Sequence, residues 1–520
     1  MVTRTYTAAH LGLDVYPVEV EIDGKQGIPQ FVLIGLASRA VEEAKERITS
    51  ALHNCGIRIR SKRTIVNLAP ASVPKSGTAF DLAIVIGLLK MYDEIALETE
   101  GTIFLGELAL DGKVKPIPGA LPLVLGAIKL GFRRVVLPKQ NVAEVSTVTG
   151  IEIFVIEHLQ EILQHAESHT LALPRVQPKA FAPPPAAPSS TTFQRIIGQE
   201  RAKKALVMAA AGGHHVLLSG PPGSGKTQLA RALPELLPTL SESESIAVTA
   251  LHSIAQQSSQ HSLSGLISQP PFRSPHHTIS RTGLLGGGNP MKPGEISLAH
   301  FGVLFLDELL EFPSPLLDML RQPLEEKSVT LSLNSGRTTF PAATTLIAAT
   351  NPCPCGYFGS GYKPCICPPG SIARYRQKLS GPLLDRFDIQ LEVDQERRLF
   401  SDAERQHAST DADTLTRFTQ LRSSIATARE RQRTRYAHLH CSSISQLSFT
   451  QLQETTRLPP QTQRTLNAFA LSQNLTGRGY WSVVKLAQTL ADLSGEQAAQ
   501  NITPTHIKEA ITFRQFSANC

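Results

Sequence analysis

A chain of 520 residues is long enough for about three or four domains of roughly 150 residues, so it can bury a sizeable core. Its formal charge of +7 and pI of about 9.0 suit a polyanionic partner but are mild for a dedicated nucleic-acid binder, so charge alone assigns none. The absence of an eighteen-residue apolar run and of an apolar signal-peptide core predicts a cytoplasmic protein with no membrane segment.

Residues 1–172 mix short β-rich runs with helical ones, such as the amphipathic pattern over 40–53, and predict an α/β domain. The stretches 106–112, 115–119 and 131–138 follow the order of the Lon-type protease fold, which this region resembles. That family carries a nucleophilic serine and a lysine base, where this chain has Ala79 and, near the lysine position, Leu121. Neither side chain can act as nucleophile or base, so we expect a non-proteolytic domain.

Residues 173–192 are proline-rich and lack apolar periodicity, which predicts an extended linker. The stretch that follows contains Ile197 and Gln199 and precedes the first helix of the next domain. AAA+ proteins approach the adenine base at the corresponding place, which makes these two residues candidate nucleotide contacts. An ordinary helix N-cap turn is the alternative.

A buried strand at 215–219 leads directly into the signature of a P-loop and then into a helix. Its glycines let backbone N–H groups wrap a triphosphate, Lys226 would reach the β- and γ-phosphates, and the Thr227 hydroxyl would ligate Mg²⁺. The sequence therefore predicts a site for ATP and Mg²⁺ made of the residues Gly220, Pro221, Pro222, Gly223, Ser224, Gly225, Lys226 and Thr227.

Two further buried strands of the same domain end on polar residues. The strand at 303–306 ends at Asp307, which would hold the Mg²⁺, and Glu308, which would polarise the attacking water. The strand at 345–350 ends at Asn351, which fits a sensor role beside the γ-phosphate. Because strands and helices alternate from 193 to 395, a parallel sheet would bring these residues to one edge, and ATP hydrolysis is expected there.

Two insertions interrupt this domain, although ATP hydrolysis does not need them. The first, 271–296, is punctuated by glycine and proline, and the second, 328–341, predicts a β-hairpin. Arg273, Lys292 and Arg337 are the candidate contacts to DNA phosphates, because similar insertions face the channel in ring ATPases related to Mg-chelatases. Each of these cations, taken alone, is more often a solvated surface charge.

Four cysteines lie within fifteen residues: Cys353, Cys355, Cys365 and Cys367. Their thiolates can form a tetrahedral Zn²⁺ site, and reduced, unligated cysteines in a reducing compartment are an equal alternative. A full shell of four sulfurs leaves no open coordination position, so such an ion would be structural rather than catalytic.

The segment 380–388 resembles the AAA+ arginine-finger segment. Arg386 would stabilise transition-state charge on the ATP of a neighbouring subunit, where a planar guanidinium serves better than a lysine. The alternative is a local salt bridge from Arg386 to Asp385 or Asp388.

Residues 396–520 are helical and basic, which predicts a helical lid. On the helix expected over 416–435, Arg422, Arg429 and Arg433 share one face, which would lie in solvent, pair with acids or contact nucleic acid. Further on, Arg478 opens the amphipathic helix expected over 483–493.

Taken in order along the whole chain, these motifs resemble the Mg-chelatase-like ComM family of bacteria. The resemblance implies an AAA+ ATPase with an N-terminal Lon-like domain and a helical lid in which Arg478 is the sensor-2 arginine. It implies a homo-hexamer, formed with ATP and DNA, that drives branch migration on single-stranded, forked or branched DNA during recombination in natural transformation. Two departures are Ser332-Leu-Asn334, where members of that family commonly carry Ser-Arg-Ala, and Ser482, where they commonly carry a second lid arginine.

Two other functions stay open at this point: the ATPase subunit of a metal-ion chelatase, and a chaperone-like AAA+ ATPase with an inactive protease domain. Neither requires DNA, so DNA stimulation of ATP turnover separates them from the motor.

Overall fold

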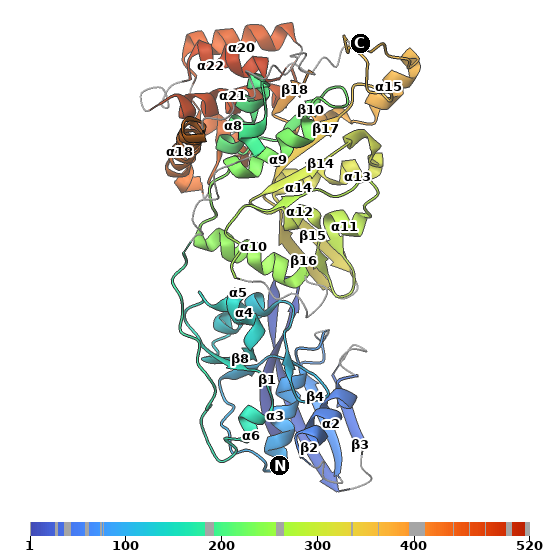
Figure 1. Ribbon diagram of the computed structural model, residues 1–520, viewed down its shortest axis with the longest axis vertical. Helices are drawn as coiled ribbons and strands as arrows, with labels where there is room; N and C mark the ends of the chain where they lie inside the picture. The colour runs from blue at the N-terminus through green and yellow to red at the C-terminus, as the bar shows by residue number, and fades with distance from the viewer. Residues whose placement is uncertain are drawn as a thin grey trace.

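The computed structural model forms two lobes with a cap of helices on the second lobe (Figure 1). It describes residues 2–26, 30–35, 43–57, 62–72, 75, 77–182, 192–255, 265–333, 336–361, 363–394, 411–439, 441–456, 458–473, 475–495 and 502–514. No helix in these ranges combines the length and the apolar character needed to cross a membrane.

A seven-stranded mixed sheet forms the centre of the N-terminal lobe, in the order β3-β4-β2-β1-β5-β8-β9. Alternate residues of its strands face opposite sides, so Phe104 packs in the core beneath helices α2 and α3, whereas Ile103 packs beneath α4. The sheet therefore has a helical layer on each face. The elements are β1 (Thr3–Leu11), β2 (Asp14–Gln26), β3 (Gln30–Ile34), β4 (Lys62–Ala69), β5 (Thr102–Phe104), β8 (Arg134–Pro138), β9 (Glu152–Ile156), α2 (Ala44–Asn54), α3 (Asp81–Met91) and α4 (Ala120–Lys129).

The second lobe contains the parallel sheet expected from the alternating pattern, with strand order β11-β14-β17-β10-β18. Its strands are β10 (Val216–Ser219), β11 (Phe272–Arg273), β14 (Val303–Leu306), β17 (Thr345–Thr350) and β18 (Ile389–Glu392). The three strands predicted from apolar runs ending on functional residues are confirmed as β10, β14 and β17. Every residue of these three strands is buried, because helices cover both faces of the sheet.

Helices α8 (Glu200–Gly212) and α9 (Lys226–Leu236) cover one face of this sheet together with the C-terminal helices. The other face packs against α11 (Arg281–Leu285), α12 (Glu295–Leu298), α13 (Ser314–Met319) and α14 (Arg321–Glu326). The C-terminal helices are α18 (Asp411–Tyr436), α19 (Phe449–Thr455), α20 (Pro460–Ser472), α21 (Gly477–Ser494) and α22 (Pro504–Thr512). The helices expected over 416–435 and 483–493 are confirmed as parts of α18 and α21.

Each of the two predicted insertions of the second lobe contains a pair of antiparallel strands. The hairpin is confirmed as β15 (Ser328–Leu333) paired with β16 (Gly336–Pro341), and a two-residue ribbon joins β12 (Gly286–Gly287) to β13 (Lys292–Pro293). The hairpin meets the N-terminal lobe, because the Thr338 hydroxyl donates to the Leu11 carbonyl oxygen over 3.2 Å.

Helix α10 (Glu242–Ala255) lies at the same junction between the lobes (Figure 1). The Gly119 N–H donates to the Ser253 carbonyl oxygen over 3.1 Å, and Ala250 is buried in the apolar core of the N-terminal lobe. The proline-rich stretch begins on that lobe as well, since Val155 N–H donates to Pro174 O and Val176 N–H donates to Ile153 O. Residues 183–191 of that stretch lie outside the described ranges.

Candidate functional site

The loop after β10 has the backbone geometry that a phosphate cradle needs. Gly223 and Gly225 adopt left-handed φ angles of 79° and 85°, which side chains other than glycine rarely accept. At Gly220 an added Cβ would lie 2.2 Å from the Val393 carbonyl oxygen, so strand and loop approach too closely for any other residue. Helix α9 then starts at Lys226, and its first N–H groups, which have no intrahelical partners, are available to bind an anion.

Lys226 is held inside this loop and contacts the predicted sensor. Its ammonium donates to the carbonyl oxygens of Gly220 (2.7 Å) and Pro221 (2.8 Å), and Asn351 Oδ1 lies 3.4 Å away. Burial lowers the pKa of Lys226 to about 8, and the Asp307 carboxylate only partly opposes this. A phosphate anion would stabilise the charged ammonium, so the site suits a polyphosphate.

The residues predicted to hold Mg²⁺ lie together. Thr227 Oγ1 donates to Asp307 Oδ2 over 3.0 Å, which places a hydroxyl and a carboxylate, the hard oxygen ligands that Mg²⁺ prefers, at the carboxyl edge of the sheet. These two residues would hold the ion, whose charge would offset that of the phosphates when it is bound.

Glu308 follows directly and has a left-handed backbone, with a φ of 50°. Its carboxylate is half-exposed and lies 3.7 Å from Nδ1 of His277. The strained backbone directs a solvent-accessible carboxylate from the strand end next to Asp307, and such a group can accept a proton from water, as its predicted role requires. His277 was missed from the sequence, because the segment between β11 and α11 has no periodic pattern that would place it near β14.

The two candidate adenine contacts lie at the same edge of the sheet as the P-loop. Gln199 is the N-cap residue of α8, but its side chain does not cap the helix and donates instead to the Asp394 carbonyl oxygen over 2.6 Å. Ile197 is 44% exposed, whereas most large apolar side chains of this lobe are buried. Both features suit contact with a planar base, and the assignment stays a prediction.

Arg386 lies at the opposite edge of the sheet from the P-loop. It precedes β18, whose first residue Ile389 pairs with Val216 at the start of β10, whereas the P-loop follows the other end of β10. Because β10 spans four residues at about 3.3 Å each, the strand itself separates the two edges by more than about 10 Å.

Glu325 joins the two arginines that were predicted to act on ATP. Its Oε2 accepts from Arg386 Nη2 over 2.5 Å and its Oε1 accepts from Arg478 Nη2 over 2.7 Å. The structure thus brings Arg386 and Arg478 together, apart from the P-loop of their own chain. Glu325 was also missed, because nothing in the short helix α14 signals that its carboxylate meets two distant segments.

Neither of the acids considered as local partners of Arg386 pairs with it, so that alternative named the wrong carboxylates. Asp385 accepts from the Thr476 hydroxyl over 3.3 Å and lies 3.7 Å from Arg514. Asp388 lies 2.9 Å from His214 Nδ1 and accepts from Ser482 Oγ over 2.6 Å.

This network around Asp388 is buried and joins the sheet to helix α21. Burial alone would raise the pKa of Asp388, but the hydrogen bonds from His214 and Ser482 and the charge of Lys485 outweigh it and lower the pKa below its usual range. Ser482 therefore has a structural role in this chain, as a donor to the buried Asp388 carboxylate.

The candidate DNA contacts lie on three different strands of the second lobe. Arg273, on β11, forms a bidentate pair with Glu295, with both N–O distances at 2.6 Å, so a phosphate would have to displace that carboxylate. Lys292 lies on β13, and Arg337 lies on β16 with an exposed side chain opposite Ser332. Their contact with DNA stays a prediction.

The four clustered cysteines converge on one point after β17. All four sulfur atoms lie within 4.8 Å of one another, and Cys353 is buried. Backbone N–H groups donate to three of the sulfurs and help to orient them: Phe358 to Cys353, Cys355 to Cys367 and Cys367 to Cys365. This arrangement is compatible with a bound metal ion, as the spacing predicted.

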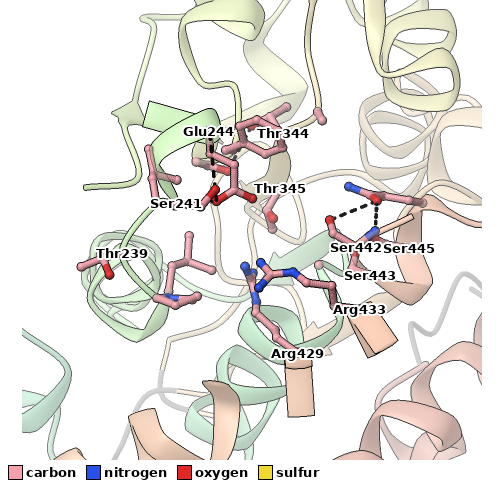
Figure 2. A pocket seen from close by; sticks show the side chains of 18 of the residues that line it. Thr239, Ser241, Glu244, Thr344, Thr345, Arg429, Arg433, Ser442, Ser443 and Ser445 are labelled. Carbon is pink, nitrogen blue, oxygen red and sulfur yellow. Dashed lines mark hydrogen bonds between the residues drawn. The ribbon is translucent and has the colours of Figure 1, made fainter. Parts of the chain in front are cut away.

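A separate cavity of about 490 Å³ lies between the sheet and α18 (Figure 2). The guanidinium groups of Arg429 and Arg433 lie next to each other in it, with Glu244 on the opposite wall. Arg429 Nε donates to the Ala210 carbonyl oxygen over 2.7 Å, and burial lowers the pKa of Arg429 to about 10. The sequence left solvent exposure, pairing with acids and nucleic-acid contact open for this arginine face. Arg433 pairs with an acid, Glu430, over 3.1 Å, whereas Arg429 is held by a backbone carbonyl oxygen and not by an acid.

In the N-terminal lobe, the two positions that correspond to protease residues carry no reactive group. Leu121 is fully buried in the first turn of α4, and Ala79 packs at the margin of the same core. Residues 73, 74 and 76 of the neighbouring loop lie outside the described ranges.

The parallel sheet, P-loop and acidic strand end define an AAA+-type P-loop ATPase, and comparison with known proteins agrees. Residues 192–399 match the family model described as magnesium chelatase, subunit ChlI, residues 18–141 match subunit ChlI of Mg-chelatase, and residues 417–514 match the subunit ChlI C-terminal model. The chain is 36% identical over 516 residues to the uncharacterized protein YifB of Salmonella typhimurium, covering 98% of this chain and 96% of the relative. It is also 36% identical over 512 residues to the competence protein ComM of Haemophilus influenzae, with the same coverage of both chains.

The chain therefore belongs to the Mg-chelatase-like family that includes YifB and ComM. A shorter stretch of 113 residues, 21% of this chain, is 28% identical to Lon protease homolog 2 of Oryza sativa subsp. japonica and covers 13% of that protein. The resemblance to Lon-type proteases is thus partial. The family implies ATP and Mg²⁺ as cofactors, and the glycine cradle and the Thr227–Asp307 pair fit both.

Proposed function

We propose that this protein is an ATP-driven motor that assembles as a homo-hexameric ring on DNA and drives branch migration. Its role would be recombination of incoming DNA during natural transformation, and the support for this role is that one full-length relative is named a competence protein. Within one chain, Lys226, Thr227 and Asp307 bind the nucleotide and metal, Asn351 orients water and Glu308 accepts its proton.

The observation that carries the proposal is the separation of the arginines from the P-loop of their own chain. Arg386 and Arg478 lie together on Glu325 at the other edge of the sheet, so neither is placed to act on the ATP that its own chain binds. A neighbouring subunit whose P-loop faces this edge would complete the site.

The proposed domain scheme has a Lon-like domain over 1–172, a linker over 173–192, an ATPase core over 193–395 and a lid over 396–520.

The experiment is ATP turnover by the full chain with and without forked or single-stranded DNA, together with conversion of a labelled branched substrate. DNA should stimulate turnover, and branch conversion should require ATP. The Lys226→Ala variant is the control, because it loses the nucleotide. If DNA does not change the rate of ATP turnover, the second candidate function, the ATPase subunit of a chelatase, is favoured. Only the descriptions of the matching family models support that candidate.

We also infer that the N-terminal lobe has no peptidase activity and that Zn²⁺ on the four cysteines would be structural. Ala79 and Leu121 offer neither nucleophile nor base. Casein degradation by the purified chain, persisting in the Lys226→Ala variant, would contradict the first inference.

The Arg337→Ala variant should weaken DNA binding for all sequences alike, because phosphate contacts carry no base information.

A further inference from the structure

The segment from Asn351 to Pro368 links the nucleotide site to helix α15 (Pro369–Gln377) and, in its described residues, contains no helix or strand. An irregular segment of this length has little core of its own, so something else must hold it in place. The four cysteines lie inside it, two near each end. A metal ion is the group that could join the ends.

The sulfur positions match the ligand shell of a single tetrahedral ion. Cys353 Sγ lies 3.4 Å from Cys355 Sγ and 3.6 Å from Cys365 Sγ, and the last two are 3.6 Å apart. A Zn–S bond of about 2.3 Å gives tetrahedral sulfur–sulfur edges of about 3.8 Å. A disulfide would need about 2.05 Å, so these cysteines are not paired as disulfides.

The same segment touches two parts of the nucleotide site. Gly356, one residue after Cys355, has a φ of 84°, and a Cβ there would lie 2.7 Å from Pro222 Cδ in the P-loop. On the other side, Cys353 is two residues from Asn351, whose Oδ1 lies 3.4 Å from Lys226 Nζ. The cysteine cluster therefore lies where it can fix the sensor and the P-loop relative to each other.

The far end of the segment is tied back as well. Arg376 of α15 donates through Nε to the Pro352 carbonyl oxygen over 3.2 Å, and its guanidinium lies 5.0 Å from the centre of the Phe358 ring. These contacts orient the loop, but they depend on one long, half-buried side chain. An ion bound by Cys353, Cys355, Cys365 and Cys367 would lock the same geometry far more rigidly.

We propose that these four cysteines bind one Zn²⁺ ion, and that the metal-bound loop is a brace that positions Asn351 against the P-loop through the contact of Gly356 with Pro222. The cysteines are positioning residues, since they would act on the nucleotide site through Asn351 and Gly356. The brace rests on the proposed ATPase activity for its kinetic effect, whereas metal binding does not.

The first measurement is the metal content of the purified full chain by mass spectrometry, with zinc and iron determined together. About one equivalent of zinc per chain is expected. Cys365→Ser and Cys367→Ser should each lose it, while Cys441→Ser, a cysteine remote in sequence from the cluster, should keep it. Wild-type protein without zinc, or with iron in its place, would overturn the assigned ion.

The second measurement separates the brace from the metal with a matched pair of variants. Gly356→Ala places a Cβ against Pro222, whereas Gly359→Ala has a similar φ of 76° and nothing within 4 Å of the added atom. Both should keep zinc. We expect kcat to fall roughly tenfold or more in Gly356→Ala, with the KM for ATP changed far less, and no change in Gly359→Ala.

A third readout does not depend on activity. Amide hydrogen exchange in residues 216–227 and 345–356 should quicken in Cys365→Ser and Gly356→Ala and stay at the wild-type rate in Gly359→Ala. If Gly356→Ala leaves both exchange and kcat unchanged, the brace is wrong even where zinc is present. If wild-type protein hydrolyses no ATP, the proposed function fails, and zinc content with exchange still decides on the brace.

Discussion

Replacing Glu325 by glutamine tests whether Arg386 works on a neighbouring subunit. In the single chain this carboxylate holds Arg386 at 2.5 Å and Arg478 at 2.7 Å, so both guanidinium groups must leave it to reach an ATP elsewhere. Arg386 Nε is buried without a hydrogen-bond partner among the described residues, so the pairing satisfies this side chain only in part. Glu325→Gln should therefore favour the state in which Arg386 and Arg478 leave this side chain and contact the ATP of a neighbouring subunit.

The size of the effect follows from the exposure of the pair. The Arg386 side chain is only 13% exposed, but the Glu325 carboxylate is 54% exposed, and solvent screening at that carboxylate limits the contribution of the ion pair to about 1 kcal/mol. Removing such a competing pair should lower the protein concentration for half-maximal ATP turnover by up to about fivefold, since 1.4 kcal/mol is about tenfold. The free energy of unfolding should fall by less than about 1 kcal/mol.

The assay is the ATPase rate across a range of protein concentrations, with Glu326→Gln as control. Glu326 lies on the same helix, but its carboxylate accepts from Gln322 over 3.0 Å. Its replacement should therefore leave the dependence of the ATPase rate on protein concentration unchanged. If Glu325→Gln instead lowers turnover tenfold at every concentration, then Glu325 supports Arg386 in its working position and the reasoning is refuted.

Two further predictions concern the chemistry and the acid sensitivity of the fold. Glu308→Gln should keep ATP binding and cut hydrolysis by orders of magnitude, whereas Lys226→Ala should lose binding; fluorescent-nucleotide titration beside turnover checks both, and near-normal turnover in Glu308→Gln would remove its assigned role. Burial lowers the pKa of His215 to about 3 and that of His300 to about 4, and each Nδ1 accepts a backbone N–H, so both must stay neutral in the folded protein. Their contribution to stability is complete above the unfolded pKa of about 6.5 and is lost as pH falls below it, by up to about 1.4 kcal/mol per pH unit for each histidine. Denaturant unfolding between pH 7 and 4.5 should show this slope, and His300→Gln should make it shallower; an unchanged slope in that variant would contradict the assignment.

The elements that the sequence predicts well are those whose signal is local. A buried apolar strand followed by glycines, lysine and threonine requires only neighbouring residues to be recognised, and β10, β14 and β17 lie where the apolar runs place them. The parallel pairing then brings Thr227 to 3.0 Å from Asp307, eighty residues apart, because parallel strands end at one edge.

The parts that the sequence could not predict depend on contacts between distant segments. Glu325 in α14 contacts Arg386 and Arg478 only because three separate elements pack together. The spacing of these residues along the sequence gives no sign of that contact. The partner of Arg273 was missed for the same reason, since Glu295 lies 22 residues further along the chain and on another element. The acids next to Arg386 in sequence were natural candidates, but the helical turn directs its guanidinium elsewhere.

The most direct test of a shared active site mixes two inactive subunits. Arg386→Ala lacks the arginine offered to a neighbour, and Glu308→Gln lacks the general base of its own site, so each alone should be nearly inactive. In mixed rings, a Glu308-containing site of one subunit meets the Arg386 of the other, and some ATPase activity should return in proportion to the number of such junctions. Activity in the mixture no greater than the sum of the two separate variants would contradict the central claim that this chain hydrolyses ATP only between subunits.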